Sequence, residues 1–380
     1  MIEQYLKPIT FDLELFVQKL PTFTLGKVID KHTENHFPSL DDVQIALLTV
    51  DEFRGGDIDE TELSFFEIRK NLYELYQGNW SSKIVDLGTL EAGNMLEDTY
   101  FALREICEYL LKQNILPIII GGSQDLTYPI YRAYDKLDQM VNLVTVDNKI
   151  DIVKDFAQPS ENFLTKIIME EPTNLRNFSN LGYQTYFNSQ EELDLIESMY
   201  FEAYRVGELA HDLTLIEPIL RDADIVSVDV AAIKSADMGY YRKFNPNGFD
   251  GREICTITRY AGISDKVSIF GLFNIGTKDA KSPLLAQMIW YFLEGYNYRI
   301  NEYPYISKKN YFKYIVANED QDLIFYKSDM SGRWWIELQY SDMEDNERKV
   351  LFPCSKRDYD NSLKGEIPER WWKAMKKLLI

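Results

Sequence analysis

The sequence has little positive charge and no long apolar run. Lysine and arginine number 41 against 61 aspartate and glutamate residues, so the formal net charge is −20 over 380 residues. A chain this acidic is repelled by nucleic-acid phosphates and by anionic lipid headgroups, so we expect neither nucleic acid nor a membrane as a partner. No segment approaches the roughly 18 to 20 apolar residues that a membrane-spanning helix needs.

Cysteine is also scarce. The chain has three cysteines, Cys107, Cys255 and Cys354, which are far apart and lie within patterned segments. An odd, scattered set of this kind indicates buried, reduced thiols and excludes a disulfide framework. The amino terminus lacks the basic and then apolar order of a secretory signal, so we expect a cytoplasmic protein.

Histidine is equally rare, with three in the chain. His32 and His36 are four residues apart, a spacing that could place two metal ligands on one helix face. Pro38 follows closely and no acidic or cysteine motif completes such a site, so we expect surface histidines. His211 precedes Asp212 near a predicted helix start, where a structural role is expected.

Short apolar runs alternate with longer segments of helical period through most of the chain, which predicts an α/β protein with a parallel sheet and crossover helices. Two of the runs are apolar without alternation, as expected for strands that are covered on both faces. The predicted strands are 43–50, 83–87, Leu116–Ile120, Val141–Val146, 201–206, 224–230 and 267–272. The predicted helices are 60–76, Leu96–Lys112, 126–137, 190–199, 254–261 and 284–298.

The pattern changes near residue 300. Short alternating runs at 323–326, 334–340 and 350–352 predict a small β-meander, and Pro368 opens a last helix over 369–380. We therefore expect an N-terminal segment (1–40) that packs on the core, an α/β domain (41–300) and a C-terminal α+β extension (301–380). The two tryptophan pairs of the extension favour docking on the parent domain, with a partner site as the alternative.

Polar segments follow two of the predicted strands, and a third segment closes the predicted strand 224–230. In doubly wound sheets, ligands bind beyond the carboxyl ends of the strands, so these segments are candidate site residues. The segment 231–251, rich in glycine, is a long loop of the kind that shapes a site. The three segments are Gly121-Gly122-Ser123-Gln124-Asp125, Asp147-Asn148-Lys149-Ile150-Asp151 and Ser227-Val228-Asp229-Val230-Ala231.

In order, spacing and strand context these segments resemble the ureohydrolase superfamily of arginase, agmatinase and formimidoylglutamase. The family motifs Gly-Gly-Asp-His-Ser, Asp-x-His-x-Asp and Ser-x-Asp-x-Asp supply two histidines and four aspartates to two Mn²⁺ ions, whose bridging hydroxide attacks a guanidinium or formimino carbon. The resemblance covers about residues 43–298 and implies an arginase-like, three-layer, doubly wound parallel sheet. The segments 67–73 and Phe273-Asn274 also resemble family elements, and the segment 365–372 resembles the carboxyl extension of a formimidoylglutamase-like branch.

Part of the family's site is retained. Gly121 and Gly122 stand at the glycine pair of the first motif. Asp147 and Asp151 match the aspartates of the second motif, and Asp229 matches one aspartate of the third. By this resemblance, the sequence retains three of the six metal ligands of the family.

The other positions differ. Gln124 stands at the first motif's histidine and Ser123 at its aspartate, Lys149 stands at the second motif's histidine, and Ala231 replaces an aspartate. Leu272 lies where the family has a substrate-handling glutamate. The loop 159–163 contains no histidine at the place where the family has a His-Gly for proton transfer.

These replacements disfavour metal. A Lys149 ammonium would repel a dication by roughly 8 kcal/mol at about 4 Å and an effective dielectric near 20. The same ammonium could bridge Asp147, Asp151 and Asp229 as a built-in counter-ion. We therefore expect a metal-free polar cluster and no cofactor.

The sequence thus predicts a catalytically inactive ureohydrolase-fold protein, a pseudoenzyme with a degenerate metal site that binds a small cationic metabolite or a protein partner. The family commonly forms trimers or hexamers, so the resemblance allows a homo-oligomer for this chain. One alternative is a hydrolase of C–N bonds in linear amidines, with a single Mn²⁺ on Asp147, Asp151 and Asp229. Another uses Lys149 as nucleophile or base, which its acidic neighbours disfavour because they raise the pKa of a lysine.

Overall fold

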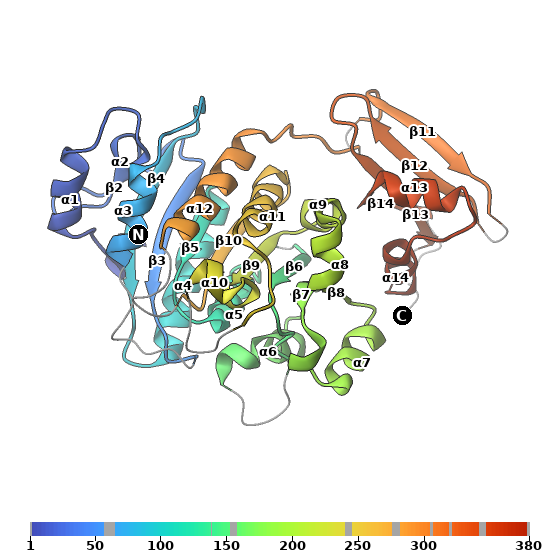
Figure 1. Cartoon of the computed structure of the whole chain (residues 1–380), viewed down its shortest axis with the longest axis horizontal. Coiled ribbons are helices and arrows are strands. Elements are labelled where there is room, and N and C mark those ends of the chain that lie inside the picture. Colours follow the sequence, from blue (N-terminus) through green and yellow to red (C-terminus); the bar gives the residue numbers. More distant parts are fainter. Residues whose placement is uncertain are drawn as a thin grey trace.

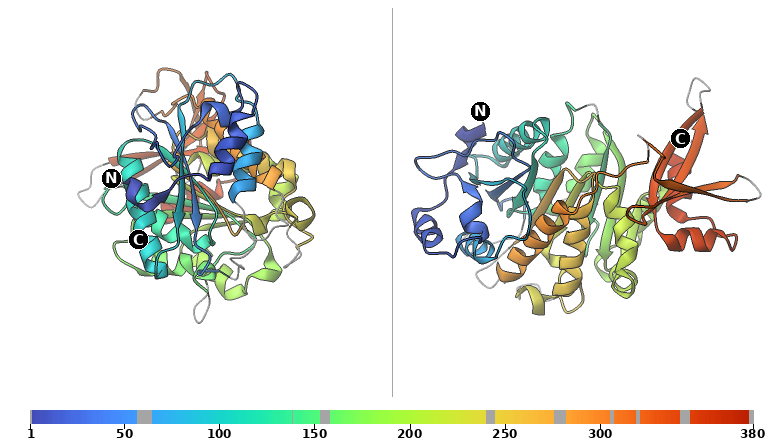
Figure 2. Two further views of the ribbon diagram at one scale, coloured as in Figure 1. Left: turned by 90° about the vertical axis from the view of Figure 1, so that its left-hand side faces the viewer. Right: turned by 90° about the horizontal axis from the view of Figure 1, so that it is seen from above.

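A computed structural model of the chain describes residues 2–56, 65–137, 139–152, 158–239, 245–275, 282–304, 307–318, 321–341 and 347–377. Figure 1 shows an α/β body with a smaller antiparallel sheet at one end, and Figure 2 shows that the amino-terminal segment lies at the opposite end of the body. None of the helices in these ranges is long and apolar enough to cross a membrane.

The body is built on one mostly parallel sheet. Its described strands follow the order β1, β4, β3, β5, β10, β9, β6, β7 and β8, and β2 pairs with β4. β1 runs antiparallel to β4, and the other pairs in this sheet are parallel. The strands are β1 (Leu6–Lys7), β2 (Asp30–Lys31), β3 (Ile45–Asp51), β4 (Ile84–Glu91), β5 (Leu116–Ile120), β6 (Val141–Val146), β7 (Leu175–Tyr183), β8 (Glu202–Arg205), β9 (Ile225–Asp229) and β10 (Ile269–Phe273).

Helices cover both faces of this sheet. In β3, Ile45 and Leu47 join the hydrophobic cluster on one face, whereas Ala46 and Leu48 join the cluster on the other. Successive strand residues point to opposite faces, so an uninterrupted apolar run is what a doubly covered strand requires. The first cluster includes α3 (Phe65–Glu74), α9 (Ile216–Arg221), α11 (Gly251–Ile263) and α12 (Ser282–Asn297), and the second includes α4 (Leu96–Lys112), α5 (Thr127–Arg132), α6 (Phe163–Met169) and α7 (Gln190–Ser198). The remaining α-helices of the body are α1 (Phe11–Gln18), α2 (Leu25–Val28), α8 (Val206–His211) and α10 (Ser235–Met238). The arginase-like three-layer fold expected from the sequence is confirmed.

The extension is a separate four-stranded antiparallel sheet with two helices. Trp335 is fully buried, and the Arg221 guanidinium of α9 lies 4.5 Å from its ring centroid. Arg221 also donates hydrogen bonds to the carbonyls of Trp334 and Cys354, so this arginine ties the extension to the body. The elements, in chain order, are β11 (Tyr311–Val316), β12 (Leu323–Ser328), β13 (Trp334–Ser341), β14 (Glu347–Cys354), α13 (Lys356–Ser362) and α14 (Glu369–Lys377).

The predicted strands and helices all occur, with shifted ends, and two of the strands that the structure adds are β7 and β11. β7 was missed because Asn177, Ser179 and Asn180 read as a loop; in the fold their polar side chains bond across to Glu202 and Thr145. The predicted helix 126–137 is shorter, since α5 ends at Arg132. Residues 60–64, 240–244 and 378–380 of the predicted segments lie outside the described residues. The division of the chain at residues 40 and 300 stays a prediction.

The histidines and cysteines are structural. His32 is buried, which corrects the expectation of a surface residue, because its ring packs on Phe37 and its Nδ1 lies 3.0 Å from the Leu87 carbonyl. His36 is exposed and contacts Asp30. His211 is exposed at the end of α8. All three cysteines are buried and free, as predicted.

Candidate functional site at the carboxyl ends of the central strands

The three polar segments meet at one edge of the central sheet. Strands β5, β10, β9 and β6 are neighbours in that order and run parallel, so their carboxyl ends share an edge (Figure 1). Gln124 follows β5, Asp147 follows β6, and Asp229 is the last residue of β9. The side chains of all three are buried. The site residues predicted from the three motifs are therefore brought together.

A glycine turn places Gln124. Gly121 and Gly122 have φ angles of +94° and +75°, which favour glycine, and a Cβ atom on them would lie 2.3 Å from Phe65 and 2.2 Å from Leu126. The Gly121 N–H donates to the carbonyl of Leu272, 2.8 Å away on β10. Leu272 is itself fully buried in the sheet, so it offers the site no polar group. The turn leaves Ser123 and Gln124 buried at the strand end.

Two of the three aspartates hold backbone amides. Asp147 Oδ1 accepts the Lys149 N–H at 2.9 Å, while its Oδ2 is buried without a hydrogen-bond partner. Asp229 Oδ1 accepts the Ala231 N–H at 2.7 Å. Both turns use a carboxylate to cap the chain where the strand ends, which fixes the direction of the carboxyl groups.

Burial dominates the titration of these acids. It raises the pKa of Asp147 well above its usual value, and the nearby Asp151 carboxyl adds to this effect. Burial likewise raises the pKa of Asp151 and of Asp229 to about 8, with further repulsion from Asp229 on Asp151 and from Asp147 on Asp229. Because the three acids repel one another, they titrate as a group. At neutral pH the cluster retains protons unless a cation binds.

The Lys149 ammonium forms no ion pair with these three aspartates. Its Nζ lies 2.6 Å from Glu161 Oε1, and both side chains are more than one-third exposed. The expectation that Lys149 bridges the three aspartates is therefore wrong. A long lysine side chain keeps its ammonium near water when a carboxylate is available there, since desolvating it is costly.

The acid–base state of Lys149 follows from the same geometry. Burial alone would lower the pKa of Lys149, but the Glu161 carboxylate raises it above its usual value, and Asp151 and Asp147 act in the same direction. The ammonium form is therefore the stable one. This disfavours Lys149 as a nucleophile or a base.

Asn274 is a site residue whose role the sequence did not reveal. Its Nδ2 donates to Asp229 Oδ2 at 2.6 Å, and its Oδ1 accepts the Gln124 N–H at 3.1 Å. It thus links the ends of β5, β9 and β10. Its place directly after a predicted strand was the available signal. Glu161 was also missed, since only the fold brings it to Lys149.

The side chains of this site are too few to bind the two Mn²⁺ ions of the family. Three carboxylates and an amide remain, no histidine is present, and both oxygens of Asp229 already accept hydrogen bonds. Among the described residues, no group of three or more histidine, cysteine or acidic side chains is arranged to hold a metal ion. A pair of dications needs more anionic and imidazole donors than this, so the residues do not fit that centre.

The fold and the site define a doubly wound α/β protein with polar groups at the carboxyl ends of its strands. The family model described as Arginase family matches residues 62–272, which is more than half of the 380 residues. The chain belongs to the arginase family. No curated protein matches it in sequence.

Solved structures agree with this fold. Formiminoglutamase of Trypanosoma cruzi, solved with Mn²⁺, is 16% identical with a TM-score of 0.61, covering 69% of this chain and 97% of that chain. Formimidoylglutamase of Bacillus subtilis is 16% identical, with 70% and 91% covered and a TM-score of 0.61. Agmatine ureohydrolase of Thermoplasma volcanium is 13% identical, with 75% and 98% covered and a TM-score of 0.56.

Proposed function

We propose that this protein is an arginase-family member that has lost two-metal hydrolysis and uses the old site as a metal-free pocket for an organic cation. The identity of three side chains carries the proposal. Gln124, Lys149 and Ala231 stand at ligand positions of the family motifs, and none of them offers an anionic or imidazole donor. We infer that this protein diverged from the formimidoylglutamase-like branch of the family.

The retained acids support a cationic ligand. Asp147, Asp151 and Asp229 form no ion pair with a lysine or arginine side chain among the described residues, and Asp147 Oδ2 has no hydrogen-bond partner. A buried acceptor without a partner costs free energy that a donor on a ligand would recover. Guanidinium and ammonium groups donate charge-assisted hydrogen bonds to such carboxylates. A protein partner that inserts a basic side chain would satisfy the same chemistry.

A second candidate is a hydrolase of linear amidines with one metal ion. The unpartnered Oδ2 of Asp147 favours it, because an orphan carboxylate oxygen is also what a single cation would use. Relatives named formiminoglutamase and agmatine ureohydrolase make this the natural activity to test. It would have to proceed without a histidine at the site.

Metal content separates the two candidates. The native protein and a Gln124→His, Lys149→His, Ala231→Asp variant are incubated with Mn²⁺, desalted and analysed for bound metal. We expect an empty native protein and a loaded variant. About one Mn²⁺ per native chain would contradict the metal-free proposal, and hydrolysis of agmatine or formimidoylglutamate would then be assayed.

Cation binding is tested separately. Calorimetric titration with agmatine, which carries both a guanidinium and an amine, should show binding to the native protein. The Asp147→Asn variant should bind it about tenfold more weakly, because one charge-assisted hydrogen bond is lost. Asp194→Asn on the surface helix α7 is the matched control and should bind as the native protein does. Equal binding by all three proteins, or none, would exclude an organic-cation pocket at these acids.

A further inference from the structure

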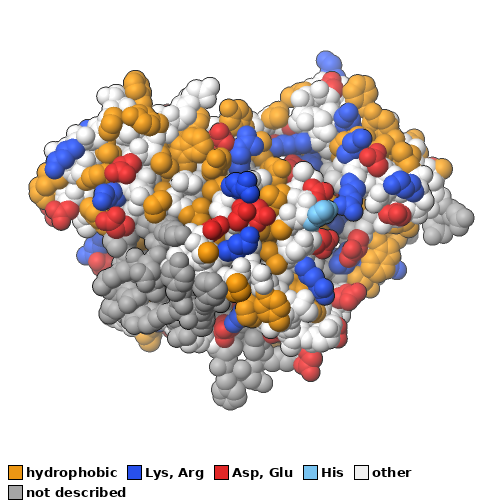
Figure 3. Space-filling view, viewed as in Figure 1, with side chains coloured by type: hydrophobic (Ala, Val, Ile, Leu, Met, Phe, Trp, Pro, Cys, Tyr) orange, Lys and Arg blue, Asp and Glu red, His pale blue; other side chains and the backbone are white. Residues whose placement is uncertain are grey.

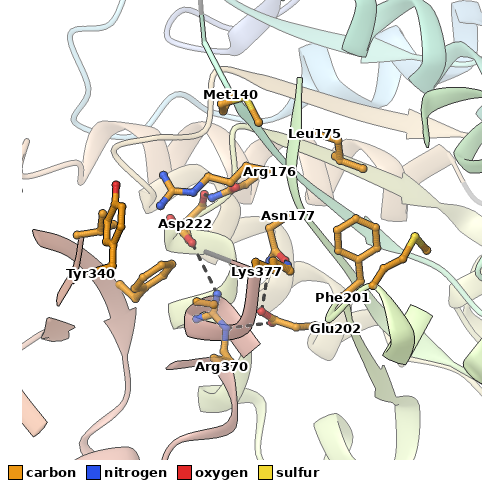
Figure 4. A pocket seen from close by; sticks show the side chains of 15 residues that line it. Met140, Leu175, Arg176, Asn177, Phe201, Glu202, Asp222, Tyr340, Arg370 and Lys377 are labelled. Carbon is orange, nitrogen blue, oxygen red and sulfur yellow. Dashed lines mark hydrogen bonds and ion pairs between the residues drawn. The ribbon is translucent and has the colours of Figure 1, made fainter. Parts of the chain in front are cut away.

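A cavity lies at the other end of the sheet, between the body and the extension. It has a volume of about 550 Å³ and is lined at the amino ends of β6, β7 and β8 and, from the extension, by β13, β14 and α14. Figure 4 shows side chains from both parts surrounding it. The family's ligand site is at the carboxyl ends of the strands, so this cavity is a different place.

The acids of this cavity are already paired. Arg370 Nε donates to Glu202 at 3.0 Å, and its Nη2 lies 3.8 Å from Asp222 (Figure 4). Asp222 also pairs with Lys266 at 3.3 Å, and Tyr204 donates to Glu202 at 2.9 Å. These contacts neutralise both carboxylates without help from any other cation of the cavity.

Two further cations face the cavity without an acid. Lys377 donates to the Asn177 side chain and makes no ion pair with a described residue. Arg176 lies 5.7 Å from the Phe352 ring centroid, and no described residue accepts a hydrogen bond from its guanidinium. Arg176, which is exposed, and Lys377 both line the cavity, so guanidinium donors and the remaining ammonium donors are available to a ligand there. The rest of the wall is largely apolar: Met140, Leu175, Met199, Phe201, Val350 and Phe352.

We propose that this interdomain cavity binds a small organic oxyanion, a carboxylate or phosphate group carried on an apolar body, with Arg176 and Lys377 holding the anionic group. A planar guanidinium matches two oxygens of either group, and an ammonium adds a point charge. The apolar wall of the cavity packs against the apolar part of the ligand. The ligand contacts the body and the extension at once, so it also stabilises their docking.

The electrostatics of Lys377 support this assignment. Burial lowers the pKa of Lys377 to about 8; Glu202 opposes this effect, whereas Arg370, Lys373 and Arg176 lower it further. The lining has three basic side chains, Arg176, Arg370 and Lys377, against two acidic ones, Glu202 and Asp222, so its formal charge is positive in a chain whose formal net charge is −20. Such local charge concentrates anions even when the whole protein repels them. The space-filling view shows basic and acidic side chains interspersed over one face of the molecule (Figure 3).

The test uses four probes and the full-length chain. Phenyl phosphate and benzoate present the two oxyanions on one apolar ring, inorganic phosphate lacks the ring, and benzylamine reverses the charge. Titration calorimetry should show binding of phenyl phosphate or benzoate, weaker binding of inorganic phosphate and none of benzylamine. The stronger of the two aromatic anions identifies the ligand class. Absence of binding by both aromatic anions would overturn the proposal, as would equal binding of benzylamine.

Variants locate the site. Arg176→Gln and Lys377→Met should each weaken binding of the preferred probe about tenfold or more, because each removes a charged donor. Lys376→Met is the matched control: Lys376 is the neighbour on α14, lies 5.5 Å from the Trp372 ring and does not line the cavity. Circular dichroism confirms that each variant is folded. Equal affinity of Arg176→Gln, Lys377→Met and Lys376→Met for the probe would overturn the assignment.

Discussion

At the carboxyl ends of β5, β6 and β9, three buried aspartates contact no basic side chain among the described residues, whereas at the amino ends of β6 and β7 two basic side chains have no acidic partner there. The first site lies where the family motifs place it. The second exists because the C-terminal sheet packs against the body. The difference teaches that one end of the sheet carries buried acids without a basic partner among the described residues, while the other end combines a basic residue of the body, Arg176, with one from the added extension, Lys377.

The largest expected effect is on stability and concerns the cavity between the body and the extension. Replacing Arg370 by methionine leaves Glu202 and Asp222 without their shared partner in a buried setting. We expect a loss of about 3–5 kcal/mol in the free energy of unfolding, the cost of removing one member of a buried ion pair. Urea denaturation measures it. Arg357→Met is the control, because Arg357 is largely exposed and lies 3.9 Å from Asp212; a loss as small as that control's would mean that Arg370 does not hold the extension.

The next effect concerns the first region and depends on pH. The folded pKa of Asp151 is about 8, above that of an unfolded aspartate near 4. Between these values the folded state holds more protons than the unfolded state, so native stability falls as pH rises from about 4 to 8. Asp151→Asn removes this penalty. It should be more stable than the native protein at pH 8 by about 2 kcal/mol, less than the about 5 kcal/mol of an isolated four-unit shift because Asp147 and Asp229 share the protons of the cluster, and the difference should vanish near pH 4.

A matched control exists for this variant. Asp42 has a φ of +59°, close to the +56° of Asp151, but it is exposed. Asp42→Asn therefore changes the same chemical group on the same backbone conformation without the buried neighbours. Urea unfolding at several pH values should give no pH-dependent gain for Asp42→Asn. A similar gain in both variants would show that the backbone, not the acidic cluster, is the cause.

The smallest expected effect is on stability and tests whether Lys149 is the counter-ion of the three aspartates. Lys149→Met should change the free energy of unfolding by less than about 1 kcal/mol, since its ion pair with Glu161 is half-exposed and screened. A built-in counter-ion of the three aspartates would instead cost about 3–5 kcal/mol when removed. Glu161→Gln is the companion variant and should give an equally small change. A large loss for Lys149→Met alone would restore the counter-ion hypothesis.

Much of the fold could be predicted from sequence pattern. The run Leu116–Ile120 has no polar side chain, so its burial on both faces could be inferred directly, whereas Val141–Val146 is equally buried but contains the polar residues Asn142 and Thr145. β7 could not, because its asparagines and serine are satisfied only by residues of neighbouring strands. The candidate site was predicted as a set of residues, since each follows a predicted strand. The partner of Lys149 was not, because Glu161 is twelve residues away in the sequence.

The sequence by itself determined the doubly wound sheet, the three strand-end motifs and the replacements at Gln124, Lys149 and Ala231. These features depend on residue type and short-range periodicity, which are local. The tertiary structure alone decided that Lys149 pairs with Glu161, that Asn274 holds Asp229, and that an interdomain cavity carries two basic side chains without an acidic partner in the described part of the chain. Each of these depends on which side chains the packing brings within hydrogen-bond distance, and on how far burial removes them from water, and neither quantity is local in the sequence.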